Sequence, residues 1–422
     1  MTIQRSKIKK VLRELEVLAG CSIEKKGDFF SNVDYWFDLI LKKFEKKHNK
    51  DINCVKVNSA RNVEKIRVSD KSFRTNYYPI HVGSIKSFFP KVSSNGSAFK
   101  HEISILTPSI EFYKIVGGSM LLLEEFGPCY FDASGDLIED LSTPYSKILF
   151  FLDVDVSDLI KFSSKYESGL VLLDRCLEPN YAHWLLDWMP RLMIKSSEEK
   201  LVLPRLKCDW QTDMLKNFSP ESDHVYLENN DFVGFSKLIV PSCGGRKVVH
   251  PANKGHPRVI EFLRSKLNIG LGQAEIFPEV LVVYRKGSRE LKNLNDVCAS
   301  FIERGMSVCI VDCSTINVRK QWALFNSAKI IVGVHGAALA SAVFMSQGSV
   351  LVEIFPASYG NPAFWIASSG LNISYISVTD VLEEDLDKKP RERGLRLTED
   401  AISSFVRYSL DLLNNAECPY SE

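Results

Sequence analysis

The sequence predicts an α/β fold built from two halves, and three observations lead to that prediction. The chain has 422 residues, more than one hydrophobic core usually serves, so we expect two domains. From about residue 165, short apolar runs alternate with segments of helical periodicity, which is typical of a parallel sheet covered on both faces. A polar break at 268–277 divides this alternation, and we therefore predict two Rossmann-like domains that face a cleft.

The composition is that of an ordinary soluble globular protein, with 45% apolar and 25% charged residues. The formal net charge of +1 gives no reason to expect a nucleic-acid partner. The ten cysteines form no CxxC pair, which favours reduced thiols over a disulfide framework. The first twenty residues lack the apolar stretch of a signal peptide, and no segment is typical of a membrane span, so we expect a cytoplasmic protein.

Residues 1–64 are expected to form a basic N-terminal helical segment. Within it, residues 1–50 carry twelve Lys and Arg against seven Asp and Glu, and four lysines cluster at 42–47 after an apolar helical stripe. One interpretation is that these helices lie on the anionic inner leaflet of a membrane, as a peripheral protein does, or dock to a biosynthetic partner. The alternative is a solvated helix face.

Residues 65–267 are predicted to form the acceptor-side domain in two pieces. Residues 65–150 contain short apolar runs separated by turn signals such as Gly117-Gly118 and Ser134-Gly135-Asp136, which predict β-hairpins or a small meander. Residues 165–267 are Rossmann-like. The strands expected there are 169–173, 201–203, 225–227 and 237–240, and the helices are 180–194, 210–218 and 257–267.

Residues 278–390, after the linker at 268–277, are predicted to form the donor-binding domain. The expected strands are 280–284, 307–311, 329–334, 350–354 and 373–378, and the helices are 294–304, 318–327, 337–345 and 363–369. Residues 391–422 contain a final helix at 399–413, which we expect to pack back across the hinge between the two domains.

A His–Asp pair is the first candidate site, on the helix predicted at 180–194. His183 and Asp187 are four residues apart, with Arg191 four residues further on, so all three share one face. An Asp one turn from a His fixes its tautomer and raises its basicity, which suits a general base. Asn180 follows a proline and is a candidate N-cap. The alternative is a buried, satisfied pair beside a tryptophan core.

Anion-binding features gather at the carboxyl ends of strands in the donor-side domain, where open α/β sheets bind ligands. Arg285 and Arg289 follow the strand 280–284 and can grip an anion in bidentate fashion. His335, Gly336, Ala337 and Ala338 open the helix after strand 329–334, where free amides attract phosphate. Glu353 ends a strand and can accept from ribose hydroxyls. The alternatives are close helix–sheet packing, a solvated basic loop and an exposed strand-end charge.

These segments, in this order, resemble those of glycosyltransferase family 61. The N-x-x-H-W-x-x-D-x-x-P-R-L segment of that family is matched by Asn180, His183, Trp184, Asp187, Pro190, Arg191 and Leu192. Its R…R-x-I/L-x-N segment is matched by Arg285, Arg289, Leu291 and Asn293, and its H-G-A-x-L…E-x-x-P segment by residues from His335 to Pro356. Ala338 replaces a usual glycine, Leu294 a usual acidic residue, and Lys320-Gln321 a usual Glu-Gln, which leaves the donor open.

The resemblance, which covers about residues 165–380, implies an inverting, metal-independent glycosyltransferase of the GT-B type. Its donor would be a nucleotide sugar, which is a substrate rather than a cofactor, and its acceptor a saccharide or a lipid-linked saccharide. It implies His183 and Asp187 as catalytic residues, Asn180, Trp184 and Arg191 on the acceptor side, and Asn293 among the donor-binding residues. Bacterial members are often associated with capsule or other surface polysaccharides.

A rival interpretation comes from Asp153-Val-Asp155, which follows an apolar run. GT-A glycosyltransferases hold a divalent cation with such a D-x-D segment. Here it precedes the alternating region, whereas a GT-A enzyme would place it after its nucleotide-binding strands. The second rival is a non-catalytic carbohydrate-binding or scaffold protein, against which the presence of His183, Asp187, Arg285 and Arg289 speaks.

Overall fold

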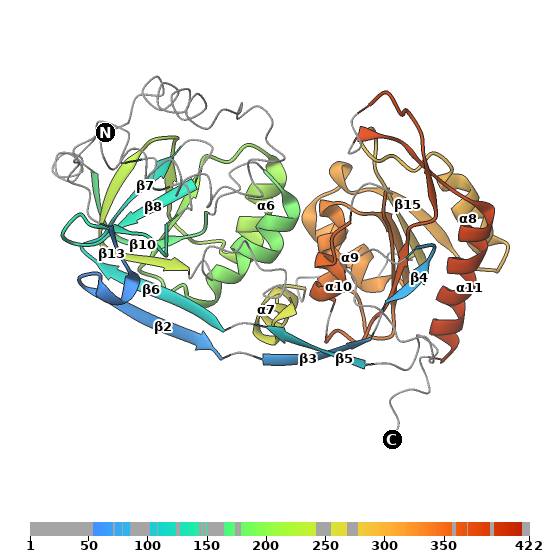
Figure 1. Ribbon diagram of the computed structural model, residues 1–422, viewed down its shortest axis with the longest axis horizontal. Coiled ribbons are helices and arrows are strands. Elements are labelled where there is room, and N and C mark those ends of the chain that lie inside the picture. Colours follow the sequence, from blue (N-terminus) through green and yellow to red (C-terminus); the bar gives the residue numbers. More distant parts are fainter. Residues whose placement is uncertain are drawn as a thin grey trace, which may run out of the picture.

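The computed structural model of the chain describes residues 54–415 apart from internal gaps. The gaps are 71, 78, 85–101, 108, 124–126, 143–145, 147–148, 150–163, 174–178, 242–254, 268–276, 357–359, 369 and 389–391. Two α/β lobes lie side by side, one around a ten-stranded sheet and the other around a six-stranded sheet (Figure 1). The predicted helices of residues 1–50, most of the linker, and Asp153-Val-Asp155 fall outside the described residues. No helix of the described part is long and apolar enough to cross a membrane.

The first sheet joins a parallel half to an antiparallel half at its long strand β13 (Phe232–Pro241). The parallel half is β10 (Ser164–Val171), β11 (Lys200–Pro204) and β12 (His224–Leu227). The other strands are β1 (Cys54–Val55), β2 (Val63–Ser69), β6 (Ile110–Val116), β7 (Ser119–Leu123), β8 (Gly127–Phe131) and β9 (Leu137–Ile138). The β-rich part and the Rossmann-like part predicted from the sequence therefore share one sheet.

The prediction of a hairpin turn at Gly117-Gly118 is wrong. Strands β6 and β7 do not pair with each other, because both run antiparallel along β13 in a single register. The two glycines lie within this line, with Gly117 in the left-handed region at a φ of 70°, where glycine carries no steric penalty. The turn at Ser134-Gly135-Asp136 is confirmed, since it joins the antiparallel strands β8 and β9.

The helix predicted at 180–194 forms, but it changes type along its length. It consists of α5 (Tyr181–His183), the π-helical η4 (Trp184–Trp188) and the 3₁₀-helical η5 (Met189–Ile194). Pro190 lies where the π turns give way to the 3₁₀ turns, consistent with the backbone donor that proline lacks. The first lobe also holds α6 (Asp209–Phe218) and α7 (Pro257–Arg264), both predicted.

The second sheet is parallel throughout, in the order β15-β14-β16-β17-β18-β4. Its strands are β14 (Val280–Tyr284), β15 (Val308–Asp312), β16 (Ile330–Val334), β17 (Val350–Ile354), β18 (Ser374–Val378) and β4 (Ile80–Val82). Five of these strands follow the predicted apolar runs closely. The sixth, β4, comes from the N-terminal part of the chain and reaches the second lobe along the ribbon of β3 (Ser72–Tyr77) and β5 (Glu102–Thr107) (Figure 1).

The final helix, α11 (Glu399–Asn415), does not pack across the hinge as predicted. It lies on the second sheet, where Ile402, Phe405 and Val406 are buried in the same core as strands β4, β17 and β18. The other helices of this lobe are α8 (Leu294–Ile302), α9 (Val318–Ser327), the 3₁₀-helical η8 (Ala337–Phe344) and α10 (Ala363–Ala367). A small hairpin of β19 (Val381–Glu383) and β20 (Leu395–Leu397) precedes α11.

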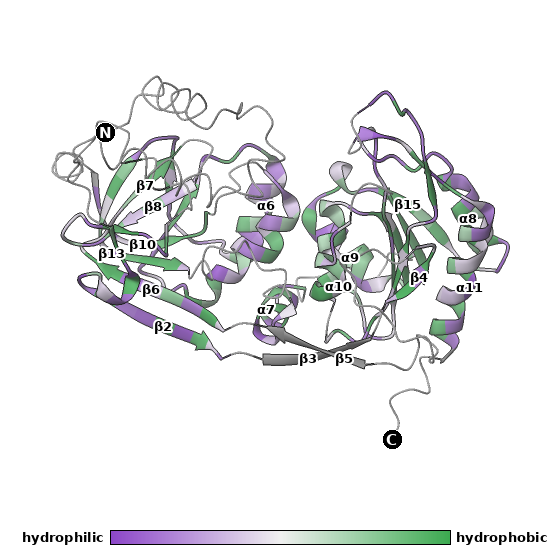
Figure 2. Ribbon diagram, viewed as in Figure 1, coloured by the Kyte–Doolittle hydropathy of each residue, from purple (hydrophilic) through white to green (hydrophobic). Residues whose placement is uncertain are grey.

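A continuous apolar core joins the two lobes. Trp322 of α9 meets Phe218 of α6 edge to face, with ring centroids 5.7 Å apart. Arg264, at the end of α7, donates to the carbonyl oxygens of Val343 and Met345 at the end of η8, at 3.1 and 2.8 Å. Hydrophobic residues follow the strands of both sheets, and hydrophilic residues mark the outer turns of the helices (Figure 2).

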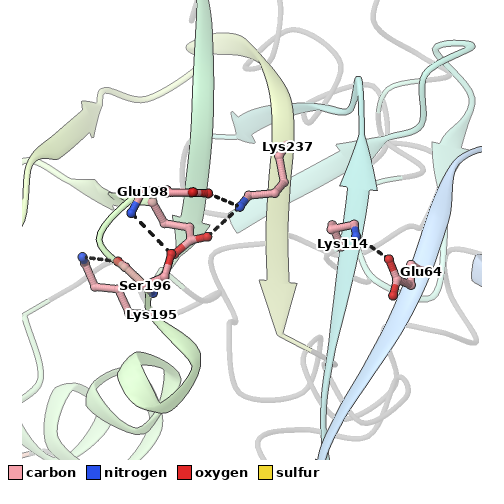
Figure 3. Close-up of polar contacts among 7 residues, drawn as sticks. Glu64, Lys114, Lys195, Ser196, Glu198 and Lys237 are labelled. Atoms are coloured by element: carbon pink, nitrogen blue, oxygen red, sulfur yellow. Dashed lines mark hydrogen bonds and ion pairs between the residues drawn. The ribbon is translucent and has the colours of Figure 1, made fainter.

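An ion-pair cluster fastens the chain after η5 to the first sheet (Figure 3). Lys237 of β13 lies 2.8 Å from Glu199 and 3.3 Å from Glu198. The Glu199 side chain is only 3% exposed and also accepts hydrogen bonds from the amide and hydroxyl of Ser196. Burial raises the pKa of Glu199, but the hydrogen bonds from Lys237 and Ser196 outweigh it, and the pKa falls below its ordinary value.

We expect Lys237→Met to lower the free energy of unfolding by about 1–3 kcal/mol at neutral pH, because it leaves a buried carboxylate without its cation. The Glu199 pKa is lowered on folding, so the pair stabilises the protein above the unfolded pKa, near 4.5, and that contribution is lost as the pH falls through the folded value. Urea unfolding at several pH values should show the difference between variant and wild type shrinking in acid.

The control for this prediction is Lys114→Met. Lys114 of β6 pairs with Glu64 of β2, whose side chain is 64% exposed (Figure 3). An exposed pair of this kind contributes about 0–1 kcal/mol, so this variant should unfold almost as the wild type does. A Lys237→Met effect that is independent of pH, or no larger than that of Lys114→Met, would contradict the assignment.

Candidate active site

The predicted general base is held on the single turn of α5 and the π turns that follow it. Asn180 is confirmed as the N-cap, since its side-chain oxygen accepts from the amides of Ala182 and His183 at 3.0 and 3.3 Å. His183 Nδ1 lies 2.7 Å from Asp187 Oδ2. Because a carboxylate only accepts, we assign the proton to Nδ1 and the lone pair to Nε2. The His183 side chain is 31% exposed and that of Asp187 only 7%, so a buried carboxylate orients a half-buried imidazole.

Arg191 and Trp184, which the resemblance places on the acceptor side, are both buried beneath this helix. Arg191 donates from Nε to the carbonyl oxygen of Asp187 at 3.0 Å, and from Nη1 to the carbonyl oxygens of Leu172 and Leu173 just beyond β10. Trp184 packs against Trp188 with ring centroids 4.6 Å apart. In the structure these two side chains support the position of His183 from the core side.

Arg285, just after β14, lies against the segment that opens η8. A Cβ atom added to Gly336 would come within 2.8 Å of Arg285 Nη1. Gly336 has extended backbone, which any residue can adopt, so a side chain here would act by displacing the end of the Arg285 side chain. Burial lowers the pKa of Arg285, although a guanidinium stays charged at neutral pH. A half-buried cation beside the first amides of a helix is a favourable place for a phosphate.

Arg289 lies in the turn that follows Arg285, with Glu290 N donating to the carbonyl oxygen of Gly287 at 3.2 Å. Its backbone is in the left-handed region, at a φ of 57°. This conformation is uncommon for residues other than glycine and is found disproportionately at functional sites. The structure thus brings Arg285 and Gly336 together and keeps Arg289 in the same loop, at the carboxyl end of β14, which lies between β15 and β16.

His335 and Glu353 belong to a buried triad with Tyr375. His335 Nδ1 is hydrogen-bonded to one carboxylate oxygen of Glu353, and Tyr375 donates its hydroxyl to the other at 2.5 Å. Glu353 is 0% exposed, so the alternative of an exposed strand-end charge is wrong. The His335 ring lies between Phe355 and Phe364, with ring centroids 5.3 Å away on each side. Burial, and then the charge of Glu353, raise the pKa of Tyr375, which keeps its proton.

The Asn293 side chain is buried, with little of it exposed to solvent. Its amide nitrogen donates to the carbonyl oxygen of Leu397, and its side-chain oxygen accepts from the amide of Leu397, both at 3.0 Å. The side chain therefore fastens β20 to the start of α8 as a two-point clamp. Ala337 and Ala338 are half-buried at the start of η8.

Two tyrosines at the site carry no sequence signal that would have revealed them. Tyr375 stands in an apolar strand, where an aromatic residue is ordinary core, and Tyr181 follows the N-cap outside the polar face of its helix. Both are recognised only by their partners, Glu353 for Tyr375 and Ser341 for Tyr181. Across the described ranges, no group of three or more His, Cys, Asp and Glu side chains is placed to hold a metal ion.

An oriented histidine on one α/β lobe, packed against a second lobe with arginines at its strand ends, suits the transfer of a group from a phosphate-bearing donor. Comparison with known proteins shows that part of the chain is similar to glycosyltransferases. Residues 181–352 match the model of the glycosyltransferase 61 family, and this segment begins at Tyr181 and ends one residue before Glu353. The matched segment thus contains a glycosyltransferase 61 domain.

Three curated relatives agree on the class of enzyme. The chain is 36% identical over 92 residues to β-1,2-xylosyltransferase XAX1 of Oryza sativa subsp. japonica, covering 22% of this chain and 16% of that protein. It is 27% identical over 160 residues to α-1,3-arabinosyltransferase XAT3 of the same plant, covering 34% and 27%. It is 27% identical over 148 residues to protein O-linked-mannose β-1,4-N-acetylglucosaminyltransferase 2 of Xenopus laevis, covering 32% and 25%. The matches span at most 27% of these relatives, which transfer different sugars.

We expect Asn293→Asp to lower the free energy of unfolding by about 1–3 kcal/mol, because the Leu397 carbonyl loses its buried donor. Affinity for a nucleotide sugar should stay near that of the wild type, since neither end of the Asn293 amide is free to reach a ligand. Urea unfolding and calorimetric binding measure the two effects separately. Asn317→Asp is the matched control, because Asn317 caps α9 only as an acceptor and aspartate keeps that role. Lost binding with unchanged stability would restore Asn293 to the donor site.

Proposed function

We propose that the protein is an inverting, metal-independent glycosyltransferase of the GT-B type that moves a sugar from a nucleotide sugar to a saccharide acceptor. The observation that carries this proposal is the His183–Asp187 pair, oriented on a helix that packs against the segment opened by His335-Gly336 beside Arg285. A single displacement needs one base for the acceptor hydroxyl and cationic stabilisation of the leaving phosphate, and the two lobes offer one each.

His183 Nε2 removes the proton from the acceptor hydroxyl as that oxygen attacks the anomeric carbon, while the bond from this carbon to the phosphate oxygen breaks. Asp187 accepts the Nδ1 proton in a hydrogen bond and stabilises the imidazolium that forms. Asp187 acting directly is the second candidate for the base. Its near-complete burial and its bond to the imidazole favour His183.

Arg285, Arg289 and the first amides of η8, at Gly336, Ala337 and Ala338, meet the charge of the leaving nucleotide. Glu353 receives a different role from the ribose contact expected from the sequence. Since both of its oxygens are already engaged, it orients His335, whose ring then lies at the start of the phosphate site. This arrangement is the one that a preorganised anion site requires.

The acceptor remains a saccharide or a lipid-linked saccharide in this proposal. A role in capsule or other surface polysaccharide synthesis, a cytoplasmic location and contact with an inner membrane surface stay predictions from the sequence. The names of the relatives suggest candidate donor sugars, since they specify the transfer of xylose, arabinose and N-acetylglucosamine. A donor screen should therefore include pentose and N-acetylhexosamine nucleotides.

We expect His183→Ala to lower turnover by about 10²–10⁴-fold, the usual scale for losing a general base, with donor affinity largely unchanged. Asp187→Asn should also lower turnover, because the amide no longer fixes the tautomer. Sugar transfer measured on purified protein with a saturating donor checks both. His224→Ala is the control, since His224 lies on the first lobe's β12, where it is hydrogen-bonded to Tyr226. Turnover should survive EDTA. Loss in EDTA with recovery in Mn²⁺ would move the chemistry to Asp153 and Asp155.

We expect Arg285→Ala to weaken nucleotide-sugar binding by about 1.5–3 kcal/mol, the usual loss for a charge-assisted hydrogen bond, and Arg289→Ala to act similarly. Gly336→Ala should weaken binding too, because its Cβ would displace the Arg285 guanidinium. Calorimetric titration with UDP-, GDP-, CMP- and dTDP-sugars measures the affinity. The exposed Arg258 on α7 offers the control substitution, Arg258→Ala. Unchanged affinity in both site arginine variants would leave a scaffold protein as the better interpretation.

A further inference from the structure

A chain of buried hydrogen bonds crosses between the lobes at Tyr181, the first residue of α5. Its hydroxyl lies 2.7 Å from the hydroxyl of Ser341 in η8 and accepts from Trp322 Nε1 of α9 at 2.8 Å. Ser341 accepts in turn from Gln321 Nε2 at 2.9 Å. Tyr181 comes from the first lobe, and the other three members of this hydrogen-bond chain come from η8 and α9 of the second.

This chain of hydrogen bonds is well suited to hold the Tyr181 side chain in one position. Ser341, Trp322 and Gln321 are each 3% exposed or less, so the polar atoms of these three side chains depend on their partners rather than on water. Burial raises the pKa of Tyr181, which keeps its phenol proton at neutral pH despite the hydrogen bonds from Ser341 and Trp322. The Tyr181 ring also meets Trp210 edge to face, with centroids 5.7 Å apart.

The location of this contact links it to the proposed chemistry. Tyr181 is two residues before His183, on a helical turn of three residues that passes directly into π turns. So short a turn has little stability of its own, and its position is set by what it packs against. It packs against η8, whose first residues lie beside Arg285.

We propose that Tyr181 is a positioning residue of the transfer reaction, whose hydroxyl, bound by Ser341 and Trp322, sets the distance from His183 to the donor site. This inference rests on the proposed function. Asp187 fixes the direction of the imidazole, and Tyr181 fixes the place of the helix that carries it. Without the hydroxyl, His183 keeps its tautomer but loses its fixed distance from the anomeric carbon of the donor sugar.

Tyr181→Phe tests the inference, because it keeps the ring and removes only the hydroxyl. We expect kcat to fall by about 10–100-fold, the scale of a misplacement of about 1 Å, while the KM for the donor stays within about twofold. Tyr226→Phe is the matched control, since Tyr226 is half-exposed on β12 and its hydroxyl is hydrogen-bonded to His224 of the same strand. An equal kcat for Tyr181→Phe and wild type would overturn the inference.

A second measurement separates positioning from a loss of folded protein. In a His183→Ala background, Tyr181→Phe should lower kcat no further, because the group that it positions is absent. Ser341→Ala removes one of the two hydrogen bonds of the Tyr181 hydroxyl from the other lobe, and it should lower kcat in the wild-type background but not in the His183→Ala background, which keeps the test available if Tyr181→Phe folds poorly. Equal losses with and without His183 would overturn this inference alone. Wild-type turnover in His183→Ala would overturn the proposed base, and this inference with it.

Discussion

The packing of η8 against the first lobe is the contact on which the rest of the structure depends. Six of its eight residues are buried, and several are Ala or Ser, so α5 and α7 approach its backbone closely. Arg264 satisfies the carbonyl oxygens at its end, and Ser341 binds Tyr181 in its middle. Its start lies beside Arg285. In the proposed function, one short 3₁₀ helix therefore sets the distance between the base in one lobe and the anion site in the other.

Two histidines at this centre have the same bond from Nδ1 to a carboxylate, and their surroundings separate their roles. His183 is about a third exposed, so its second nitrogen remains within reach of an acceptor. His335 is 9% exposed, lies between two phenylalanine rings and shares its carboxylate with Tyr375. Under the proposed function, the same pair of residue types would serve proton transfer in one lobe and rigidity of the anion site in the other, and burial rather than residue type would decide which.

Sequence patterns predicted the features of the fold and of the site that depend on residues close together in the sequence. Buried parallel strands are continuous apolar runs, so β14, β16 and β17 were placed almost to the residue, and the Asn180 cap and the His183–Asp187 pair are contacts within one turn. What depends on distant partners was missed. The two-point contact of Asn293 with Leu397, which is 104 residues away, had no signal in the sequence around Asn293. The burial of Glu353 and the pairing of both β6 and β7 with β13 likewise depend on tertiary contacts, which the neighbouring residues in the sequence do not reveal.

The edge of the second sheet is formed by β4, a strand that comes from an early part of the chain, far in sequence from the other strands of that sheet. His81 of β4 bonds to Ser377 of β18, 296 residues later, and Ile80 and Val82 are buried in the core that α11 covers. The second sheet is thus complete only when an early strand has docked at its edge. The two lobes are interlocked rather than threaded in series, so they are not modules that recombination could exchange at residues 268–277. During synthesis, β4 is therefore made well before β18, the strand of the second sheet with which it pairs.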